Sequence, residues 1–263
     1  MSSPEQTHGR SCNAAMGGAV LIDLLVGLGI GSLAIGAAIA SLLVAREAAG
    51  AVNDMSLLQQ QSAHAMRVLG LQIRTAGSAE LQASRGGVDS VRFVTLTLGS
   101  GGGENFAAVR GTHGNGRASD ILRLAQISPP LLPSHQRDCL GQDAAPGERS
   151  EASFEVDGKG SLRCRSSSGQ NQPLVAGVEA FKVRYRARQG TEIRSLRARE
   201  VEAARLWDAV VAVEVCLDLR GEERNAAHDG RYTDCTGQVT SNDGRLHLVT
   251  RRLFALRARS DRG

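Results

Sequence analysis

Cysteine is the residue type in this sequence best suited to covalent chemistry, and four of the five cysteines lie in the second half of the chain. Four cysteines can form two disulfides in three ways, and pairing neighbours along the chain gives Cys139–Cys164 and Cys216–Cys235. Each bond would close a loop of about 20 to 26 residues and stabilise the fold by about 3 kcal/mol. Zinc is disfavoured, because the chain has no CxxC and its histidines do not occur at ligand spacing. We expect disulfides, no metal and an oxidising compartment.

No other grouping of residues has the spacing of a catalytic or cofactor site. The glycine-rich stretches 99–105 and 111–119 lack the lysine of a phosphate-binding GxxxxGK[ST] loop, so we interpret them as hairpin loops. No serine, histidine and acid are arranged in a way that suggests a catalytic triad. The sequence therefore predicts neither an enzyme nor a cofactor.

One carboxylate stands alone in an apolar run: Asp23 is the only ionisable side chain in residues 19–45. As a helix rising about 1.5 Å per residue, the run would be about 40 Å long, enough to cross a hydrocarbon core of about 30 Å. It is too long for a cleaved signal peptide, whose apolar core has about 7 to 15 residues. A carboxylate at the centre of a membrane helix costs about 2.5 to 3.5 kcal/mol, less near an end, and usually has a partner or a function. A plain membrane anchor leaves Asp23 unexplained.

Two glycines give the same helix a second possible role. Gly27 and Gly31 form a GxxxG pattern, which lets helices approach closely in lipid. Glycine is also simply tolerated in membrane helices, and the sequence leaves these two interpretations open.

The elements around these residues follow from hydrophobic periodicity. Apolar residues continue at three- and four-residue steps from Val52 to Ile73, which predicts one helix from about 20 to 75. Beyond Gly77 the period becomes two, and apart from a short segment near 197–206 no helix recurs between strands. This indicates an α+β fold, with the C-terminal half of one long N-terminal helix packed on an antiparallel β-sheet domain. The predicted strands are 91–98, 120–127, 152–158, 161–166, 178–187, 208–220 and 244–259, and loops are predicted at 99–105, 111–119, 129–136 and 220–244.

Residues 18–26, Gly-Ala-Val-Leu-Ile-Asp-Leu-Leu-Val, resemble the type IV prepilin signature. In that family a glycine precedes the cleavage site, and the hydrophobic helix carries an acid at the fifth mature position. The resemblance implies cleavage after Gly18 by a prepilin peptidase and N-methylation of Ala19. The family usually has phenylalanine where Ala19 stands and glutamate where Asp23 stands, so the acid here is one methylene shorter.

The order of motifs in the second half is similar to that of the PilW-like minor pilins. "CLGQ" at 139–142 and "LRC" at 162–164 would flank a short hairpin, which implies the Cys139–Cys164 disulfide more strongly than Cys216–Cys235. A stretch with Leu174, Val175, Gly177, Val178 and Glu179 would lead into a central strand ending in Tyr185, and Trp207 would open the next long strand as a packing anchor.

The two resemblances together imply a minor pilin of the type IV pilus. The expected parts are a leader (1–18), a transmembrane and filament-core helix (19–45), an amphipathic continuation (46–76) and a periplasmic sheet domain (77–263). The expected location is the inner membrane and the pilus, as a single-pass protein. The expected partners are prepilin peptidase, other minor pilins and the major pilin, with Asp23, Gly27 and Gly31 serving assembly in a priming or tip complex.

Two alternatives remain at this point. One is the minor pseudopilin of a type II secretion system, which shares the helix and a similar sheet. The other is a DNA-binding or adhesive tip module that uses the arginines around 184–205. A net charge of +4 permits weak attraction to anionic surfaces without identifying a nucleic-acid binder, and a nucleic-acid partner is not expected.

Overall fold

The computed structural model describes residues 17–77, 81–83, 91–93, 108–116, 118–127, 137–143, 149–224 and 230–256. The chain divides into two compact units, Met1–Ala51 and Val52–Gly263. Most of the predicted leader, residues 1–16, and the predicted loops at 99–105 and 129–136 lie outside the described residues.

The long helix α1 spans Gly17–Thr75 without interruption. It contains no proline, and alanine and leucine, both strong helix formers, fill much of it. The helix ends where Gly77 adopts a left-handed φ of 73°, the usual glycine stop after a helix. The N–H of Gly77 then donates to the carbonyl of Ala125 at 2.8 Å, which joins the helix end to a strand. The predicted single helix is confirmed, with its start at Gly17 instead of about residue 20.

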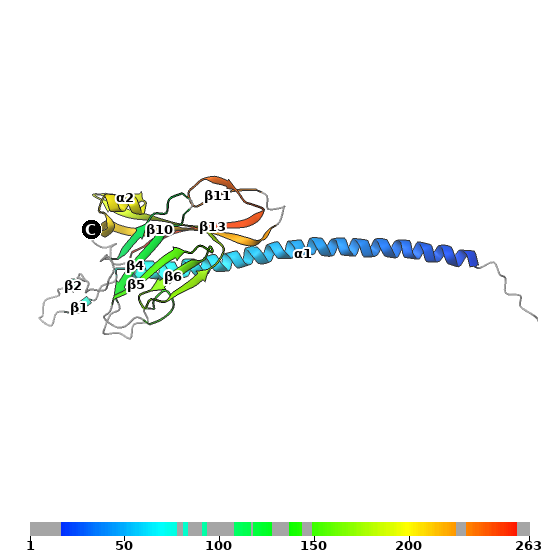
Figure 1. Cartoon of the computed structure of the whole chain (residues 1–263), viewed down its shortest axis with the longest axis horizontal. Coiled ribbons are helices and arrows are strands. Elements are labelled where there is room, and N and C mark those ends of the chain that lie inside the picture. The colour runs from blue at the N-terminus through cyan, green and yellow to red at the C-terminus, as the bar shows by residue number, and fades with distance from the viewer. Residues whose placement is uncertain are drawn as a thin grey trace, which may run out of the picture. The chain divides into compact units, whose positions relative to one another are not determined.

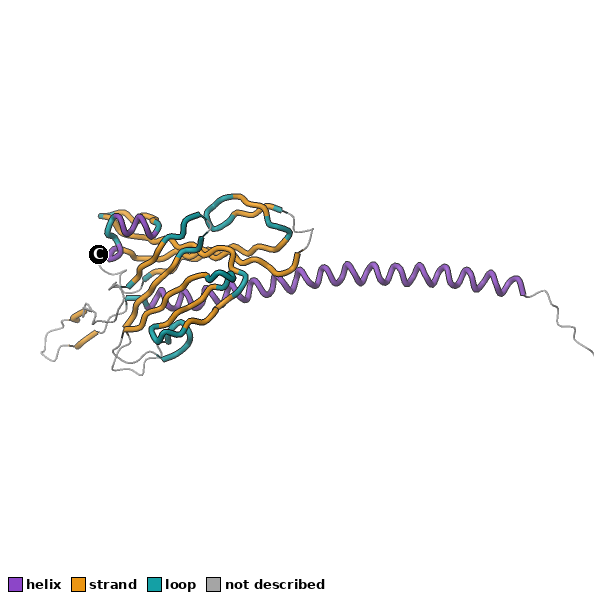
Figure 2. The backbone as a smooth tube through the Cα atoms, viewed as in Figure 1, coloured by secondary structure: helices purple, strands orange, loops and turns teal. Residues whose placement is uncertain are grey.

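The strands of the second unit form two antiparallel sheets and two separate hairpins (Figures 1 and 2). A five-stranded sheet has the order β3-β4-β5-β6-β7, and a four-stranded sheet has the order β13-β10-β8-β9. The five-stranded sheet consists of β3 (Val109–Thr112), β4 (Ile121–Ile127), β5 (Arg149–Val156), β6 (Leu162–Ser166) and β7 (Asn171–Val175). The four-stranded sheet consists of β8 (Val178–Gln189), β9 (Glu192–Leu196), β10 (Val210–Arg224) and β13 (Arg245–Ala255). The hairpins pair β1 (Leu81–Ala83) with β2 (Val91–Phe93) and β11 (Arg231–Thr233) with β12 (Val239–Ser241), and a short helix α2 (Ala198–Ala203) and a 3₁₀ turn η1 (Trp207–Ala209) precede β10.

The core lies where the second half of α1 meets the inner faces of both large sheets. Leu69 and Ile73 of the helix are fully buried in one cluster with residues of the two sheets, such as Phe154 and Val213. Fully burying an aliphatic side chain of this size stabilises the fold by about 1.5 to 3 kcal/mol. A hydrogen bond of 2.8 Å between the Ser62 and Thr250 hydroxyls adds a polar contact between the helix and β13.

Gly221 of β10 allows this strand to lie close to the part of α1 that begins the second unit. At Gly221 an added Cβ would collide with the Asp54 carboxylate, so only glycine lets strand and helix approach this closely. Asp54 is buried, and its Oδ1 accepts a hydrogen bond from the N–H of Glu222 at 3.3 Å.

The strand pattern departs from the sequence prediction in the polar segments. Residues 220–244 were expected to form a loop, but β10 continues to Arg224 and the β11–β12 hairpin follows within this segment. The predicted loop 111–119 begins inside β3, and Tyr185 lies within β8, which continues to Gln189. Strands β11 and β12 and the last residues of β10 lack an apolar alternation because most of their side chains are exposed. The predicted α+β fold, with one long helix packed on antiparallel sheet, is confirmed.

Candidate functional site

The first unit presents an almost wholly apolar helix surface with a single carboxylate. Side chains from Leu21 to Val44 are exposed or nearly so, with large aliphatic residues such as Leu33 exposed by 75%. Asp23 is exposed and has no hydrogen bond or ion pair within the described part of the chain. Among the described residues, α1 is the one helix that is long and apolar enough to cross a membrane. An exposed apolar surface of this extent is typical of a membrane or protein contact.

Within the described residues, no contact requires the glycines of the GxxxG pattern. A Cβ added at Gly27 or at Gly31 would meet nothing within 4 Å. Steps of four residues place Gly27 and Gly31 on the same side of the helix as Asp23. Ala34, Ala38 and Ser41 continue this side at three- and four-residue steps, so the carboxylate stands at the start of a stripe of small residues.

The predicted processing site lies within the first turn of α1. The helical backbone begins at Gly17 and runs through Gly18 and Ala19. The structure places no strand or turn between the predicted leader and the apolar helix at this point.

The first disulfide joins a turn to the middle of the five-stranded sheet. Cys139 and Cys164 are bonded, with a Cα–Cα distance of 6.3 Å, and both are buried. Asp138 shapes the turn, because its Oδ1 accepts hydrogen bonds from the N–H groups of Leu140 and Gln142. The Gln72 side chain of α1 donates to the carbonyl of Arg137 at 2.9 Å, so the same turn is also attached to the helix.

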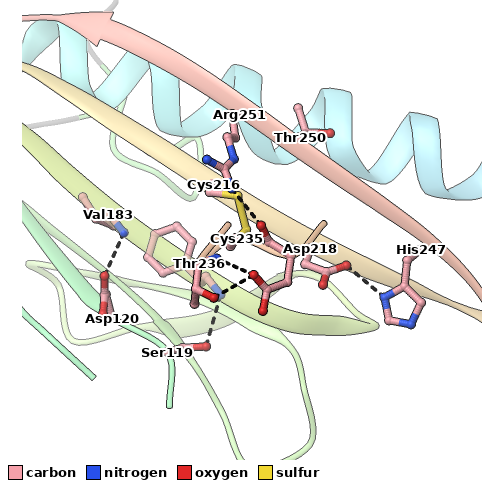
Figure 3. The surroundings of a disulfide bond; sticks show 12 residues. Ser119, Asp120, Val183, Cys216, Asp218, Cys235, Thr236, His247, Thr250 and Arg251 are labelled. Atoms are coloured by element: carbon pink, nitrogen blue, oxygen red, sulfur yellow. Dashed lines mark hydrogen bonds and ion pairs between the residues drawn. A yellow bond between two sulfur atoms is a disulfide. The ribbon is translucent and has the colours of Figure 1, made fainter. Parts of the chain in front are cut away.

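The second disulfide fastens the β11–β12 hairpin to the outer face of β10 (Figure 3). Cys216 and Cys235 are bonded, with a Cα–Cα distance of 5.6 Å. Next to them, the buried carboxylate of Asp218 accepts a hydrogen bond from the Tyr232 hydroxyl and lies 3.1 Å from Nδ1 of His247. The Tyr232 and His247 rings stack with centroids 4.2 Å apart. Burial and the neighbouring Asp218 charge raise the pKa of the Tyr232 hydroxyl, so it stays protonated and keeps donating.

The turn between β11 and β12 is built by Asp234. Its Oδ1 accepts hydrogen bonds from the Thr236 hydroxyl and from the N–H groups of Thr236 and Gln238. Partial burial raises the pKa of Asp234, but these hydrogen bonds together outweigh burial and lower the pKa below its ordinary value. The carboxylate is thus ionised at neutral pH, as this turn requires.

A buried polar cluster connects the two large sheets. Asp120, which precedes β4, accepts a hydrogen bond from the N–H of Val183 in β8 at 2.8 Å, and its other oxygen lies 3.0 Å from Nδ1 of His113. Lys182 donates to the carbonyls of Gly114, Gly116 and Ala118. Every charge in this cluster has partners within the protein, so the cluster has a structural role.

Trp207 is a packing residue, as predicted. Its ring meets the fully buried Tyr185 ring edge to face, with centroids 5.0 Å apart, and its Nε1–H donates to Glu202. Burial raises the pKa of Tyr185, so this hydroxyl remains neutral.

The arginines around 184–205 do not converge on one site. Arg184, Arg186 and Arg188 project from one face of β8, and Arg186 is paired with Glu214 at 2.8 Å. Others in this range follow on β9, on α2 and in its flanking turns. Within the described residues, no group of three or more histidine, cysteine or acidic side chains is arranged to hold a metal ion.

The sequence did not point to the Asp120–Lys182 cluster or to the Asp218, Tyr232 and His247 group. Bonded members of the first group are up to 68 residues apart along the chain, and Asp218 and His247 are 29 residues apart, so no periodic pattern marks such pairs. The predicted Asp23, Gly27 and Gly31 lie together on one helix, while the two disulfides lie in the other unit.

Residues 152–258 match the family described as Type IV Pilus-assembly protein W. Among solved structures, a type IV-like pilin from Thermus thermophilus is similar with a TM-score of 0.46 and 15% identity, over 76% of this chain and 95% of that chain. A comparison with curated protein sequences finds no match. The matched residues 152–258 run from β5 through β13, so this part of the chain resembles the family of PilW-like pilus-assembly proteins.

Proposed function

We propose that this pilin is a minor pilin that takes part in type IV pilus assembly, within a priming or tip complex. It would enter the inner membrane through residues 19–45 and be cleaved after Gly18 by prepilin peptidase, leaving Ala19 as an N-methylated terminus. The helix would continue through 46–76 into a periplasmic domain at 77–263. Its work would be assembly with other minor pilins and the major pilin, and it would need no catalytic residue or cofactor.

One observation carries the proposal: among the described residues, Asp23 has no hydrogen bond or ion pair, and no contact requires Gly27 or Gly31. Glycines that no contact inside the chain requires are explained if another helix approaches that face. A carboxylate with no partner in the described part of the chain is explained if a neighbouring subunit supplies a cation. We assign this cation to the free N-terminal amine of an adjacent pilin.

The periplasmic location of the domain rests on its disulfides. Disulfides form and persist in oxidising compartments and are rare in the cytosol. The two bonds in the second unit support a position of this unit on the periplasmic side of the inner membrane.

The experiment that tests the assembly role compares Asp23→Ala with Asp23→Glu in cells that depend on this chain for piliation. If an ion pair in lipid drives assembly, Asp23→Ala should reduce surface pili at least about tenfold. This corresponds to an ion pair that contributes about 1.4 kcal/mol or more to assembly. Asp23→Glu should assemble as well as the natural chain, since it restores the acid usual in the family. Unchanged piliation with Asp23→Ala would contradict the role.

Processing is tested separately by the intact mass of the membrane-extracted protein. The mature chain should begin at Ala19, carry one methyl group and show the loss of hydrogen expected for two disulfides. An unprocessed N-terminus would overturn the proposal as a whole.

The alternative of a minor pseudopilin shares the helix and the sheet domain. The family match favours the pilus, because the description of that family names pilus assembly. Gene neighbours that encode a secretion system in place of a pilus system would reverse this preference.

A further inference from the structure

Strand β13 forms one edge of the four-stranded sheet and is long for an edge strand. It spans Arg245–Ala255 and pairs with β10, and within the described residues no strand pairs with its other side. An unpaired strand presents a row of N–H and C=O groups to which another chain can bind.

The register shows which backbone groups of β13 face outward. The N–H of Leu256 donates to the carbonyl of Val211 at 2.9 Å, and the next pair along the ladder is Ala212 with Ala255. In an antiparallel ladder, only alternate pairs of opposed residues exchange hydrogen bonds. The backbone groups of Arg251, Leu253 and Ala255 therefore point away from β10.

Among the described residues, the part of β8 that precedes its pairing with β9 also lacks a neighbouring strand on that side, and there side chains cover the backbone. On β8, the N–H groups of Phe181 and Val183 donate to the Ser119 hydroxyl and to the Asp120 carboxylate (Figure 3). Within the described part of the chain, no such contact reaches the outward backbone groups of β13 between Arg251 and Ala255.

Burial changes along β13 at the same point. From Arg245 to Thr250 every residue is partly buried, and the neighbouring β11–β12 hairpin contributes through the stacking of Tyr232 on His247. Beyond Thr250, the side chains of Arg251, Arg252 and Leu253 are exposed, Leu253 by 57%. The open part of the edge thus combines free backbone groups with an exposed aliphatic side chain.

Charge decides which kind of chain can pair there. Arg251 and Arg252 are consecutive, so they project from opposite faces of the sheet. Arg251 donates to the carbonyl of Asp234, and Arg252 has no hydrogen bond or ion pair within the described residues. Arginines on an edge strand oppose pairing with a second copy of the same edge and favour a strand with acidic side chains.

We propose that the edge of β13 from Arg251 to Ala255 binds an extended acidic segment of a neighbouring pilin by strand addition. Main-chain hydrogen bonds would supply affinity, as in other edge-binding modes, and the two arginines would select acids at adjacent positions. The identity of the partner as a pilin rests on the proposed function, whereas the binding chemistry of the edge does not.

The test uses the full-length chain in detergent micelles and fluorescent capped peptides of valine and threonine. One peptide carries a central Glu-Glu pair, and its control carries Lys-Lys. The acidic peptide should bind at least about tenfold more tightly than the basic one at low salt. Equal affinity for the two peptides, or no binding of the acidic peptide, would overturn the proposal.

Two variants separate strand addition from simple charge attraction. Leu253→Pro removes an outward N–H while leaving the β10 ladder intact, and should weaken the acidic peptide about tenfold, whereas Leu253→Thr should retain most of the affinity. Arg252→Glu should remove most of the preference for the acidic peptide, because only Arg251 remains to oppose the new acid, and it keeps the test decisive if the proline variant does not fold. Equal binding by the proline and threonine variants, both folded by circular dichroism, would contradict strand addition. If the peptide tests failed while Asp23→Ala reduced piliation and the mature protein had the expected mass, the proposed function would stand without this edge interaction.

Discussion

Asp120 is the residue that most directly joins the two large sheets. It is almost fully buried, and it satisfies the Val183 N–H of one sheet from a position just before β4 of the other. The ammonium of Lys182 lies 3.9 Å from it. Removing the carboxylate would leave a buried N–H without its acceptor and remove the anion nearest to a buried cation.

We predict that Asp120→Ala lowers stability by about 3 kcal/mol or more, because loss of one partner leaves buried polar groups uncompensated. For a chain of this size the melting temperature of the detergent-solubilised protein should fall by about 6 °C or more. The matched control is Asp143→Ala, which removes an exposed ion pair with Arg137 and should cost less than about 1 kcal/mol. Equal melting temperatures for the two variants would contradict a bridging role for Asp120.

Gly177 shows why one glycine of the sequence motif is needed. Its φ is 70°, and an added Cβ would lie 2.8 Å from the carbonyl oxygen of Arg220. Gly190 has a similar φ of 63°, but a Cβ there would meet nothing within 4 Å. Comparing substitutions at Gly177 and Gly190 therefore separates the cost of backbone strain from the cost of a steric collision.

We predict that Gly190→Ala costs about 1 kcal/mol from the left-handed backbone alone. Gly177→Ala should cost at least about 1 kcal/mol more, because the collision involves backbone that also forms the Arg220 N–H to Gly177 C=O hydrogen bond. Thermal unfolding of the two variants measures the difference. If Gly177→Ala proved no worse than Gly190→Ala, the close approach to Arg220 would have no energetic consequence.

At the scale of elements, the sequence predicted what hydrophobic periodicity can encode. The helix and the strands β4, β5, β8 and β10 were predicted because each buries a set of apolar side chains. Strand β13 was also predicted, although only Phe254 of this strand is buried. Strand β7 contains Pro173, which argues against a central strand, and it lies at the edge of its sheet, where proline is tolerated. The three-residue strands β11 and β12 expose most of their side chains, and a disulfide, a stacked histidine and a buried carboxylate hold this hairpin in place. Such contacts between distant segments leave no local pattern.

The two disulfides close loops of similar length but occupy different environments. Their sequence separations are 25 and 19 residues, so chain entropy alone gives each about 3 kcal/mol. Cys139 and Cys164 belong to the main hydrophobic cluster, whereas Cys216 and Cys235 lie under the β11–β12 hairpin on the outer face of β10.

We therefore predict that Cys139→Ala with Cys164→Ala lowers the melting temperature more than Cys216→Ala with Cys235→Ala. The first pair loses core packing as well as loop closure, and buried cavities add to the cost of removing atoms. The second pair should instead make the hairpin more susceptible to brief proteolysis while the core stays folded. Equal melting temperatures, or a protected hairpin in the second variant, would contradict this division.

At the scale of the whole molecule, the exposed apolar surface of the first unit is the feature that calls for partners other than this chain. Its helix exposes leucines, isoleucines and valines along most of its length, and an apolar surface of this extent marks a membrane or protein contact. The sequence identified this helix and its carboxylate but could not separate tolerated glycines from packing glycines. In the structure, no contact among the described residues accounts for Gly27 or Gly31, so their role depends on whether another helix packs there.

We predict that Gly27→Leu and Gly31→Leu reduce co-purification with other pilins by about tenfold or more, while Gly29→Leu, the matched control, has little effect. All three glycines have free space around them, so none of the changes should alter the melting temperature of the sheet domain. Gly29 lies two residues from each of the others and hence on a different side of the helix from Asp23, so a leucine there leaves the small-residue stripe open. Each change increases the hydrophobicity of the helix, so membrane insertion should be retained in all three variants. Equal losses for all three variants would mean that bulk anywhere on the helix disturbs assembly, and unchanged co-purification with Gly27→Leu and Gly31→Leu would exclude the stripe as the packing face.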